Sequence, residues 1–141
     1  MLQSGNVVLR GRVKTAAALE ALLEKEIGRR LGVSADFHVR TADEWRRVVG
    51  ANPFRDEAVK APSHLLVTFF KAPLDPKKVT ALQAAITGRE AVRCDGRQLY
   101  MTFPDGIGDS KAPALVDKTL GARGTSRNWN TVMKLAALAC P

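Results

Sequence analysis

The order of apolar and polar positions at the start of the chain predicts a strand followed by a helix. The strand covers residues 7–13, which begin with an apolar run. Thr15 is placed to cap the helix, and Gly32 is placed to end it. The apolar residues between them recur every three to four positions, at Leu19, Leu22, Leu23, Ile27 and Leu31.

A second strand and helix follow before residue 52. Residues 36–40 alternate apolar with polar side chains, which is typical of a short strand. The segment Thr41-Ala42-Asp43-Glu44 has the spacing of a capping box and opens a helix. Asn52-Pro53 ends that helix, and residues 52–62 are predicted to form a loop between two halves of the chain.

The second half has stronger local signals. Residues 64–70 are the most apolar segment, so they predict a central strand that is covered on both faces. Asp75-Pro76 is a typical helix start, and that helix continues to residue 86. Asp95-Gly96 separates two strand-like segments, 91–94 and 98–103, and predicts a hairpin. A loop at 104–108 and helices at 112–120 and about 127–139 complete the pattern.

These elements predict an α+β fold, a mixed sheet with helices packed on one side, in the manner of ferredoxin-like units. We expect a single domain, residues 1–141, made of two related halves at about 1–52 and 63–141. The length of 141 residues and the 45% hydrophobic content are sufficient for a core without a metal or disulfide framework.

Cysteine usage and hydropathy predict a cytoplasmic protein. Cys94 and Cys140 lie far apart in the sequence, so we interpret them as reduced thiols. The polar residues after Met1 do not resemble a signal peptide. Elsewhere, no run approaches the roughly 18 apolar residues that a membrane helix needs. We therefore expect neither export nor membrane insertion.

The charge balance favours an anionic partner. Lys and Arg total 22 against 14 Asp and Glu, which gives a net charge of +8. Such a balance raises the chance of binding nucleic acid or a phosphorylated metabolite. The cations are scattered singly or in pairs, and only 6% of residues are aromatic. Single-strand binders usually interleave cations with aromatic stacking platforms, so nucleic acid is not the favoured partner.

The signature Ser126-Arg127-Asn128-Trp129-Asn130-Thr131 is the first candidate site. We expect it at a helix start, where free N–H groups and the helix dipole favour an anion. Arg127 would add a bidentate grip on phosphate or carboxylate. The candidate ligand-binding residues are Ser126, Arg127, Asn128 and Asn130. The alternative is that Thr125 or Ser126 only caps the helix, Arg127 pairs with a nearby acid, and Trp129 fills the core.

A second signature, Gln3-Ser4-Gly5-Asn6, lies at the other end of the chain. Gln3, Ser4 and Asn6 would add amide and hydroxyl groups to the same ligand site if the two ends meet. Gly5 would allow a ligand or another backbone to approach closely. The alternative is a polar turn whose side chains satisfy neighbouring peptide groups.

Metal and catalytic signals are weak. His38 and His64 have no further ligands at zinc-binding spacing, so we predict no metal site. Asp105 and Asp109 flank a glycine loop that could recruit a cation or act in acid–base chemistry, and the alternative is a solvated turn. No nucleophile-elbow pattern surrounds Ser4, Ser63, Ser110 or Cys94. The residues assign neither a catalytic group nor a cofactor, and the question of an enzyme stays open.

Several motifs together carry a family resemblance. Besides the two signatures, the chain has an Asn52-Pro53-Phe54 turn, Tyr100, Pro104-Asp105-Gly106 and Ser110-Lys111 in matching order. In these motifs the chain resembles the bacterial domain-of-unknown-function family 1697 over almost its whole length. The resemblance implies two related halves and a bacterial protein, and it implies no established activity.

The resemblance also implies a shortened N-terminus. Members of the family begin with a glycine-rich strand and a helix before they reach the Gln-Ser-Gly-Asn strand, and this chain starts at that second landmark. A sheet without its first strand would present an unpaired edge and an uncovered apolar face. We therefore expect a homo-oligomer that associates through the exposed N-terminal edge.

Three functions compete on this basis. The first is a binding module for a small anion, a nucleotide or a phosphorylated ligand, which would hold phosphate near residues 125–128. The second is an enzyme acting on a small phosphorylated metabolite, which would have a pocket containing a carboxylate with a raised pKa. The third is a nucleic-acid-binding or assembly protein, and an assembly protein would present a large apolar interface.

Overall fold

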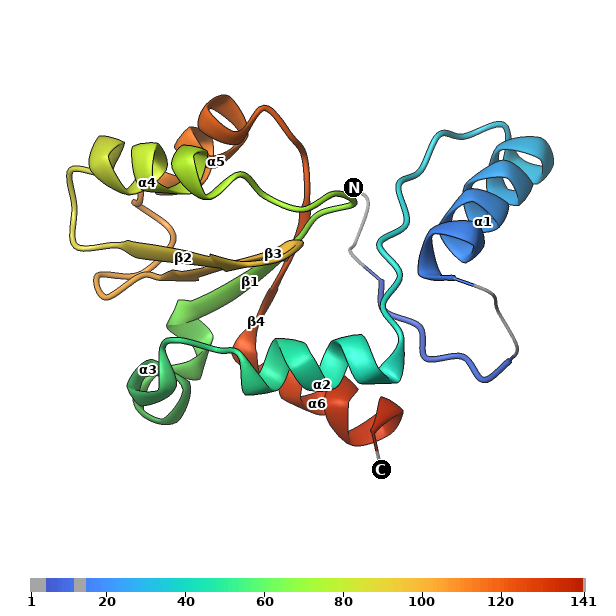
Figure 1. Ribbon diagram of the computed structural model, residues 1–141, viewed down its shortest axis with the longest axis horizontal. Coiled ribbons are helices and arrows are strands. Elements are labelled where there is room, and N and C mark those ends of the chain that lie inside the picture. The colour runs from blue at the N-terminus through green and yellow to red at the C-terminus, as the bar shows by residue number, and fades with distance from the viewer. Residues whose placement is uncertain (1–4, 12–14, 141) are drawn as a thin grey trace.

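The computed structural model describes residues 5–11 and 15–140 (Figure 1). Its centre is a four-stranded sheet in the order β2-β3-β1-β4. The strands are β1 (Leu65–Phe69), β2 (Ala91–Asp95), β3 (Gln98–Thr102) and β4 (Thr125–Asn128). All three neighbouring pairs are antiparallel. The predicted α+β class is confirmed, but the sheet is antiparallel where a mixed sheet was expected.

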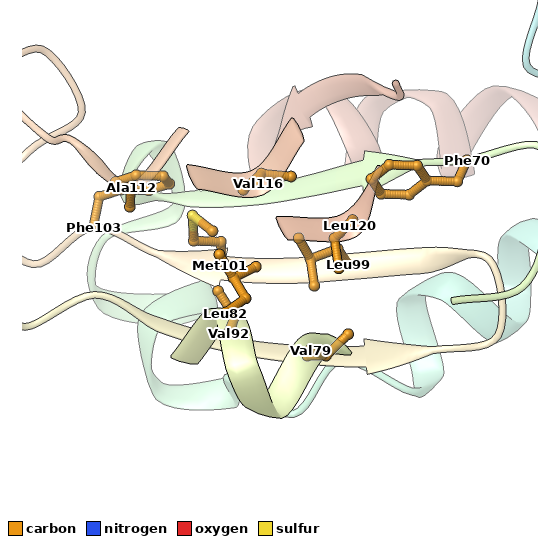
Figure 2. Packing of buried hydrophobic residues seen from close by; sticks show 10 residues of the cluster. All are labelled: Phe70, Val79, Leu82, Val92, Leu99, Met101, Phe103, Ala112, Val116 and Leu120. Atoms are coloured by element: carbon orange, nitrogen blue, oxygen red, sulfur yellow. The ribbon is translucent and has the colours of Figure 1, made fainter. Parts of the chain in front are cut away.

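One face of the sheet is covered by α4 (Pro76–Ala85) and α5 (Ala112–Leu120), which lie together above the strands (Figure 1). The side chains of Leu99 and Met101 point to this face, because alternate residues of a strand share a face. Figure 2 shows Phe70 at one end of this core and Phe103 at the other. The buried members are Phe70, Val79, Leu82, Val92, Leu99, Met101, Phe103, Ala112, Val116 and Leu120.

The opposite face packs against α2 (Ala42–Gly50) and α6 (Trp129–Ala139). Tyr100, between Leu99 and Met101, is fully buried here, and its hydroxyl donates to the Val48 carbonyl at 2.6 Å. The buried members of this second core are Val48, Leu65, Val67, Phe69, Tyr100, Trp129 and Val132. Helices therefore cover both faces of the sheet, so the expectation of helices on one side was wrong.

Strong local signals produced the predicted elements in the second half. The β2–β3 hairpin forms around Gly96, whose φ of 56° requires the left-handed region that glycine adopts easily. Asp75 caps α4, and its carboxylate accepts from the Lys77 N–H at 2.9 Å. The segment predicted as a loop at 52–62 instead contains α3 (Arg55–Lys60) and the short 3₁₀ helix η1 (Pro62–His64).

The described residues before 41 form an N-terminal arm that lies to one side of the sheet (Figure 1). We use this name for residues 5–11 and 15–40, and we call residues 41–140 the sheet body. The arm contains α1 (Ala16–Leu31), which Thr15 caps and Gly32 ends, as predicted. The strands expected at 7–13 and 36–40 do not form in the described residues, because neither segment has a strand to pair with.

Both apolar cores are built from the sheet body. Among the described residues, neither core includes a side chain before Trp45. The relation between two halves of the chain stays a prediction, since the described part of the first half forms no sheet. None of the described helices is long and apolar enough to span a membrane.

Candidate functional site

Arg127 lies on edge strand β4, where a helix start was predicted. Thr125–Asn128 pairs with β1, and α6 begins only at Trp129. The strand forms because β1 supplies its hydrogen-bond partners, which no local sequence signal reveals. The expected helix-start geometry therefore does not apply to Ser126 and Arg127.

The Arg127 guanidinium joins the two sequence signatures. Its Nε donates to Asn6 Oδ1 at 2.7 Å, and Nη2 donates to the Gly5 carbonyl at 3.2 Å. Nη1 donates to Thr125 Oγ1 and to the Ser126 carbonyl, both at 2.7 Å. All four acceptors are neutral, and burial lowers the pKa of Arg127. The two ends of the chain thus meet, but the guanidinium is already engaged by protein atoms.

The other signature residues have local structural roles. Asn128 caps α6, because its Oδ1 accepts from the Thr131 N–H at 3.1 Å, so neither Thr125 nor Ser126 is the cap. The hydroxyls of Ser126 and Thr68 lie 2.7 Å apart across the sheet. Trp129 is buried in the second core. Asn130 is exposed in the first turn of α6, and the candidate residues Gln3 and Ser4 lie outside the described residues.

A second guanidinium, that of Arg40, also connects the arm to the body. Here the donor belongs to the arm and the acceptors belong to the body. Its Nη2 donates to the Phe70 carbonyl at 2.6 Å and its Nε donates to Gln98 Oε1 at 2.9 Å. It also lies 5.5 Å from the centre of the Phe69 ring. Burial, reinforced by the nearby Arg97 charge, lowers the pKa of Arg40 to about 10. The sequence analysis missed this residue, because nothing in its neighbourhood distinguishes it from the other arginines.

Further polar contacts complete the junction between arm and body. Lys71 binds the Glu24 carboxylate and lies 3.7 Å from Asp36. Within the arm, buried Glu20 accepts from the Val39 N–H at 2.6 Å. Nε2 of His38 is buried and has no hydrogen-bond partner among the described residues. Burial lowers the pKa of His38, while the Glu20 charge opposes this shift.

A basic depression lies beside this junction. Its volume is about 280 Å³, and it is bordered by the loop between β1 and α4 and by the segment after α5. We define the basic depression by Lys71, Lys78 and Arg123, which line it together with Asp36 and Asp75. In the described residues, Lys78 and Arg123 form no ion pair, whereas Lys71 is paired with Glu24. The apolar lining consists of Phe70, Ala72, Pro73, Leu74, Leu120 and Ala122.

Gly124 explains how Arg123 reaches the depression. A Cβ at this position would lie 2.6 Å from the Phe69 carbonyl and 3.1 Å from the Phe70 ring. The backbone after α5 therefore passes directly against the end of β1, which only glycine allows. The sequence contains the Arg123-Gly124 dipeptide, but it could not predict that Arg123 and Lys78 line the same depression.

The acidic loop does not have the properties expected of an acid–base site at Asp105. Asp105 forms an ion pair with Arg89, which lowers the pKa of the carboxyl. Asp109 lines a separate cavity of about 240 Å³ with Glu90 and Ser110. There the Ser110 hydroxyl donates to Glu90 Oε1 at 2.6 Å and accepts from the Ala112 N–H at 3.2 Å. Within the described ranges, no group of three or more His, Cys, Asp or Glu side chains could hold a metal ion.

Comparison with known proteins identifies a family but no activity. No curated protein and no solved structure matches the chain. The family described as "Protein of unknown function (DUF1697)" matches residues 1–100. This range includes the arm and strands β1 and β2, and it ends before α5 and the Ser126–Thr131 signature. Because the match covers more than half of its length, the chain belongs to this family.

Proposed function

We propose that this protein is a binding module for a small phosphorylated or otherwise anionic ligand, and that the ligand occupies the basic depression. The observation that carries the proposal is the placement of Lys78 and Arg123 on one concave surface without carboxylate partners in the described residues. Unpaired cations in a concavity attract an anion more strongly than the same cations on a convex surface.

Three cations against two carboxylates give the residues that line the depression a net charge of +1. Asp75 directs one carboxylate oxygen to the backbone at the start of α4, as its capping hydrogen bond shows. Asp36 lies on the side of Lys71, which also binds Glu24. Lys78 and Arg123 are therefore the two groups that we expect to contact the ligand's anionic part.

The apolar lining suggests the rest of the ligand. Leu74 gives the depression an apolar wall beside its cations, together with the smaller residues Ala72, Pro73 and Ala122. Small-molecule sites commonly combine such a wall with a few polar anchors. A nucleotide, or a phosphorylated metabolite with an apolar portion, fits this combination better than free phosphate does.

The Ser126–Thr131 signature is a weaker candidate for the same ligand. An anion that binds Arg127 must displace Asn6, the Gly5 carbonyl or the two acceptors on β4. Each displaced acceptor would lose a hydrogen bond worth about 0.5–1.5 kcal/mol. Lys78 and Arg123 have no such partners to lose in the part of the chain that the structure describes.

The test is a calorimetric titration of the protein with inorganic phosphate and with nucleoside mono-, di- and triphosphates. We expect the variant Lys78→Ser/Arg123→Ser to bind at least about tenfold more weakly than the parent chain. Lys118→Ser/Lys134→Ser is the matched control, since it removes the same charge from exposed positions away from the depression. The control should bind within about twofold of the parent chain.

Two outcomes would contradict the proposal. Equal weakening in both double variants would mean that only net charge matters. Loss of binding in Arg127→Ala with full binding in Lys78→Ser/Arg123→Ser would place the anion at the Ser126–Thr131 signature. An enzyme acting on a phosphorylated metabolite would use the same contacts, and ³¹P NMR of the titrated samples would reveal it through product formation.

A further inference from the structure

Exposed apolar side chains concentrate in the N-terminal arm. The described residues expose nine large apolar side chains, and six of them belong to the arm. These six are Val7, Val8, Leu9, Leu22, Leu31 and Val33. Exposed apolar residues on a monomer are usually scattered singly, so a concentration in one region indicates a surface that something covers.

Outside α1, the described backbone of the arm is also largely unpaired. Residues 5–10 and 33–40 are neither helix nor strand, and they form no backbone–backbone hydrogen bond with another described residue. Side chains satisfy only a few of their peptide groups, including the Gly5 carbonyl and the Val39 N–H. Residues 7–9 are Val-Val-Leu, which favour strands. Such a segment can pair with a strand of another chain.

The total surface is too large for a compact monomer. The chain exposes 9349 Å². A folded monomer of 15.3 kDa is expected to expose about 7,100 Å² from the usual scaling of surface with mass. The excess of about 2,200 Å² exceeds the roughly 800 Å² that each partner buries in a standard interface. The excess is therefore large enough to supply one partner's share of a stable dimer interface.

We propose that a second copy of this chain covers the arm. In this dimer, residues 7–9 of the two copies pair as antiparallel strands across a twofold axis. Val7 and Leu9 then lie on one face of the two-stranded pair, because alternate residues of a strand share a face. A twofold interface uses the same patch on both copies, so every apolar side chain that it buries counts twice.

The charges on α1 are compatible with contact between two copies of the chain. Glu26 pairs with Arg29 and Arg30 within α1, and Glu24 pairs with Lys71. Helix α1 is therefore nearly neutralised, and two copies of this basic protein can meet there without strong like-charge repulsion. Arg10, which follows residues 7–9, and Lys25 on α1 are exposed and form no ion pair within the described residues, so a lipid surface is tested directly with vesicles below.

The experiment is sedimentation velocity on the full chain over a concentration series. The variant Val7→Ser/Leu9→Ser changes side chains that are 79% and 65% exposed. Its matched control, Val59→Ser/Leu138→Ser, changes side chains on the sheet body that are 83% and 66% exposed. We expect a dimer whose Kd rises by about 100-fold or more in the arm variant and by less than about threefold in the control.

Hydrogen exchange provides the second measurement. The amides of residues 7–9 should exchange more slowly as the concentration rises, because strand pairing between copies protects them. This readout distinguishes pairing of the arm from association elsewhere on the chain.

Three results would overturn the inference: a monomer at high micromolar concentration, equal weakening in the arm and control variants, or a monomer that floats with phosphatidylcholine vesicles. The substituted side chains are exposed, so circular dichroism should show an unchanged fold in both variants. The proposal does not depend on the basic depression, whose Lys78 and Arg123 remain intact in these variants.

Discussion

The sheet body is stabilised by apolar burial, whereas the N-terminal arm is attached to it mainly by polar contacts. The body has two apolar cores on opposite faces of an antiparallel sheet. The arm instead contacts the body through Arg40, Arg127 and Lys71, all of which bind polar partners. Apolar burial resists local opening more strongly than a few solvent-accessible hydrogen bonds do. We infer that the body can stay folded while the arm opens.

The second core contains an aromatic stack that has no counterpart in the described residues of the arm. Trp45 stacks on Phe69 with ring centres 5.0 Å apart, and its indole N–H donates to the Val132 carbonyl at 3.1 Å. These contacts connect α2, β1 and α6. No comparable set of aromatic side chains lies within the described residues of the arm.

The largest effect should come from removing a core side chain from the body. Trp129→Ala should lower the free energy of unfolding by about 3–5 kcal/mol, because the indole is buried in the second core. Urea denaturation measures this loss. Leu22→Ala, in the arm, is the contrasting variant and should change stability by less than about 0.5 kcal/mol. Similar losses in the two variants would show that the arm and the body share one core.

A smaller effect is expected from Arg127→Ala. This change should lower the free energy of unfolding by less than about 1 kcal/mol, because water can replace the exposed hydrogen bonds. It should nevertheless increase hydrogen exchange in the arm, since Arg127 holds Gly5 and Asn6. Nucleotide affinity should stay unchanged if the basic depression is the ligand site. A loss of stability as large as that of Trp129→Ala would make Arg127 part of the core architecture.

The smallest effect concerns pH and His38. Burial lowers the pKa of His38, so the undocked arm binds a proton more readily than the docked arm does. Docking is therefore strongest above the ordinary histidine pKa of 6.5 and weakens as the pH falls towards the lowered value. Glu20 and Asp36 oppose this effect, whereas Lys71 and Arg40 reinforce it.

An NMR titration of the arm amides from about pH 8 to about pH 5 would follow the undocking. His38→Gln should abolish the pH dependence, and His64→Gln, on the sheet body, should retain it. A pH dependence that persists in His38→Gln would assign the effect to another group.

Local interactions made much of the helical structure predictable. The capping box at Thr41 and Glu44 forms with both of its hydrogen bonds, and Thr15 caps α1 as its position indicated. Asp75-Pro76 begins α4, and Gly96 lies in the predicted hairpin turn. Each of these features depends on residues within about four positions of one another, so a single sequence contains the necessary information.

The candidate site was less predictable because its contacts join distant segments. Asn6 and Arg127 are 121 positions apart, and Arg40 is 58 positions from Gln98. The signatures at the two ends suggested a meeting point, and the structure brings Asn6 to Arg127. The basic depression had no comparable signal, since Lys78 lies in α4 and Arg123 in the segment after α5.

The sequence by itself determined the helix caps at Thr15, Thr41 and Asp75, the hairpin and the apolar strand that became β1, because short-range hydrogen bonds and residue preferences decide them. Only the tertiary structure decided that Thr125–Asn128 is a strand and that residues 7–10 are not. A strand exists only where another strand satisfies its backbone. β1 does this for β4, and no described strand does it for the arm.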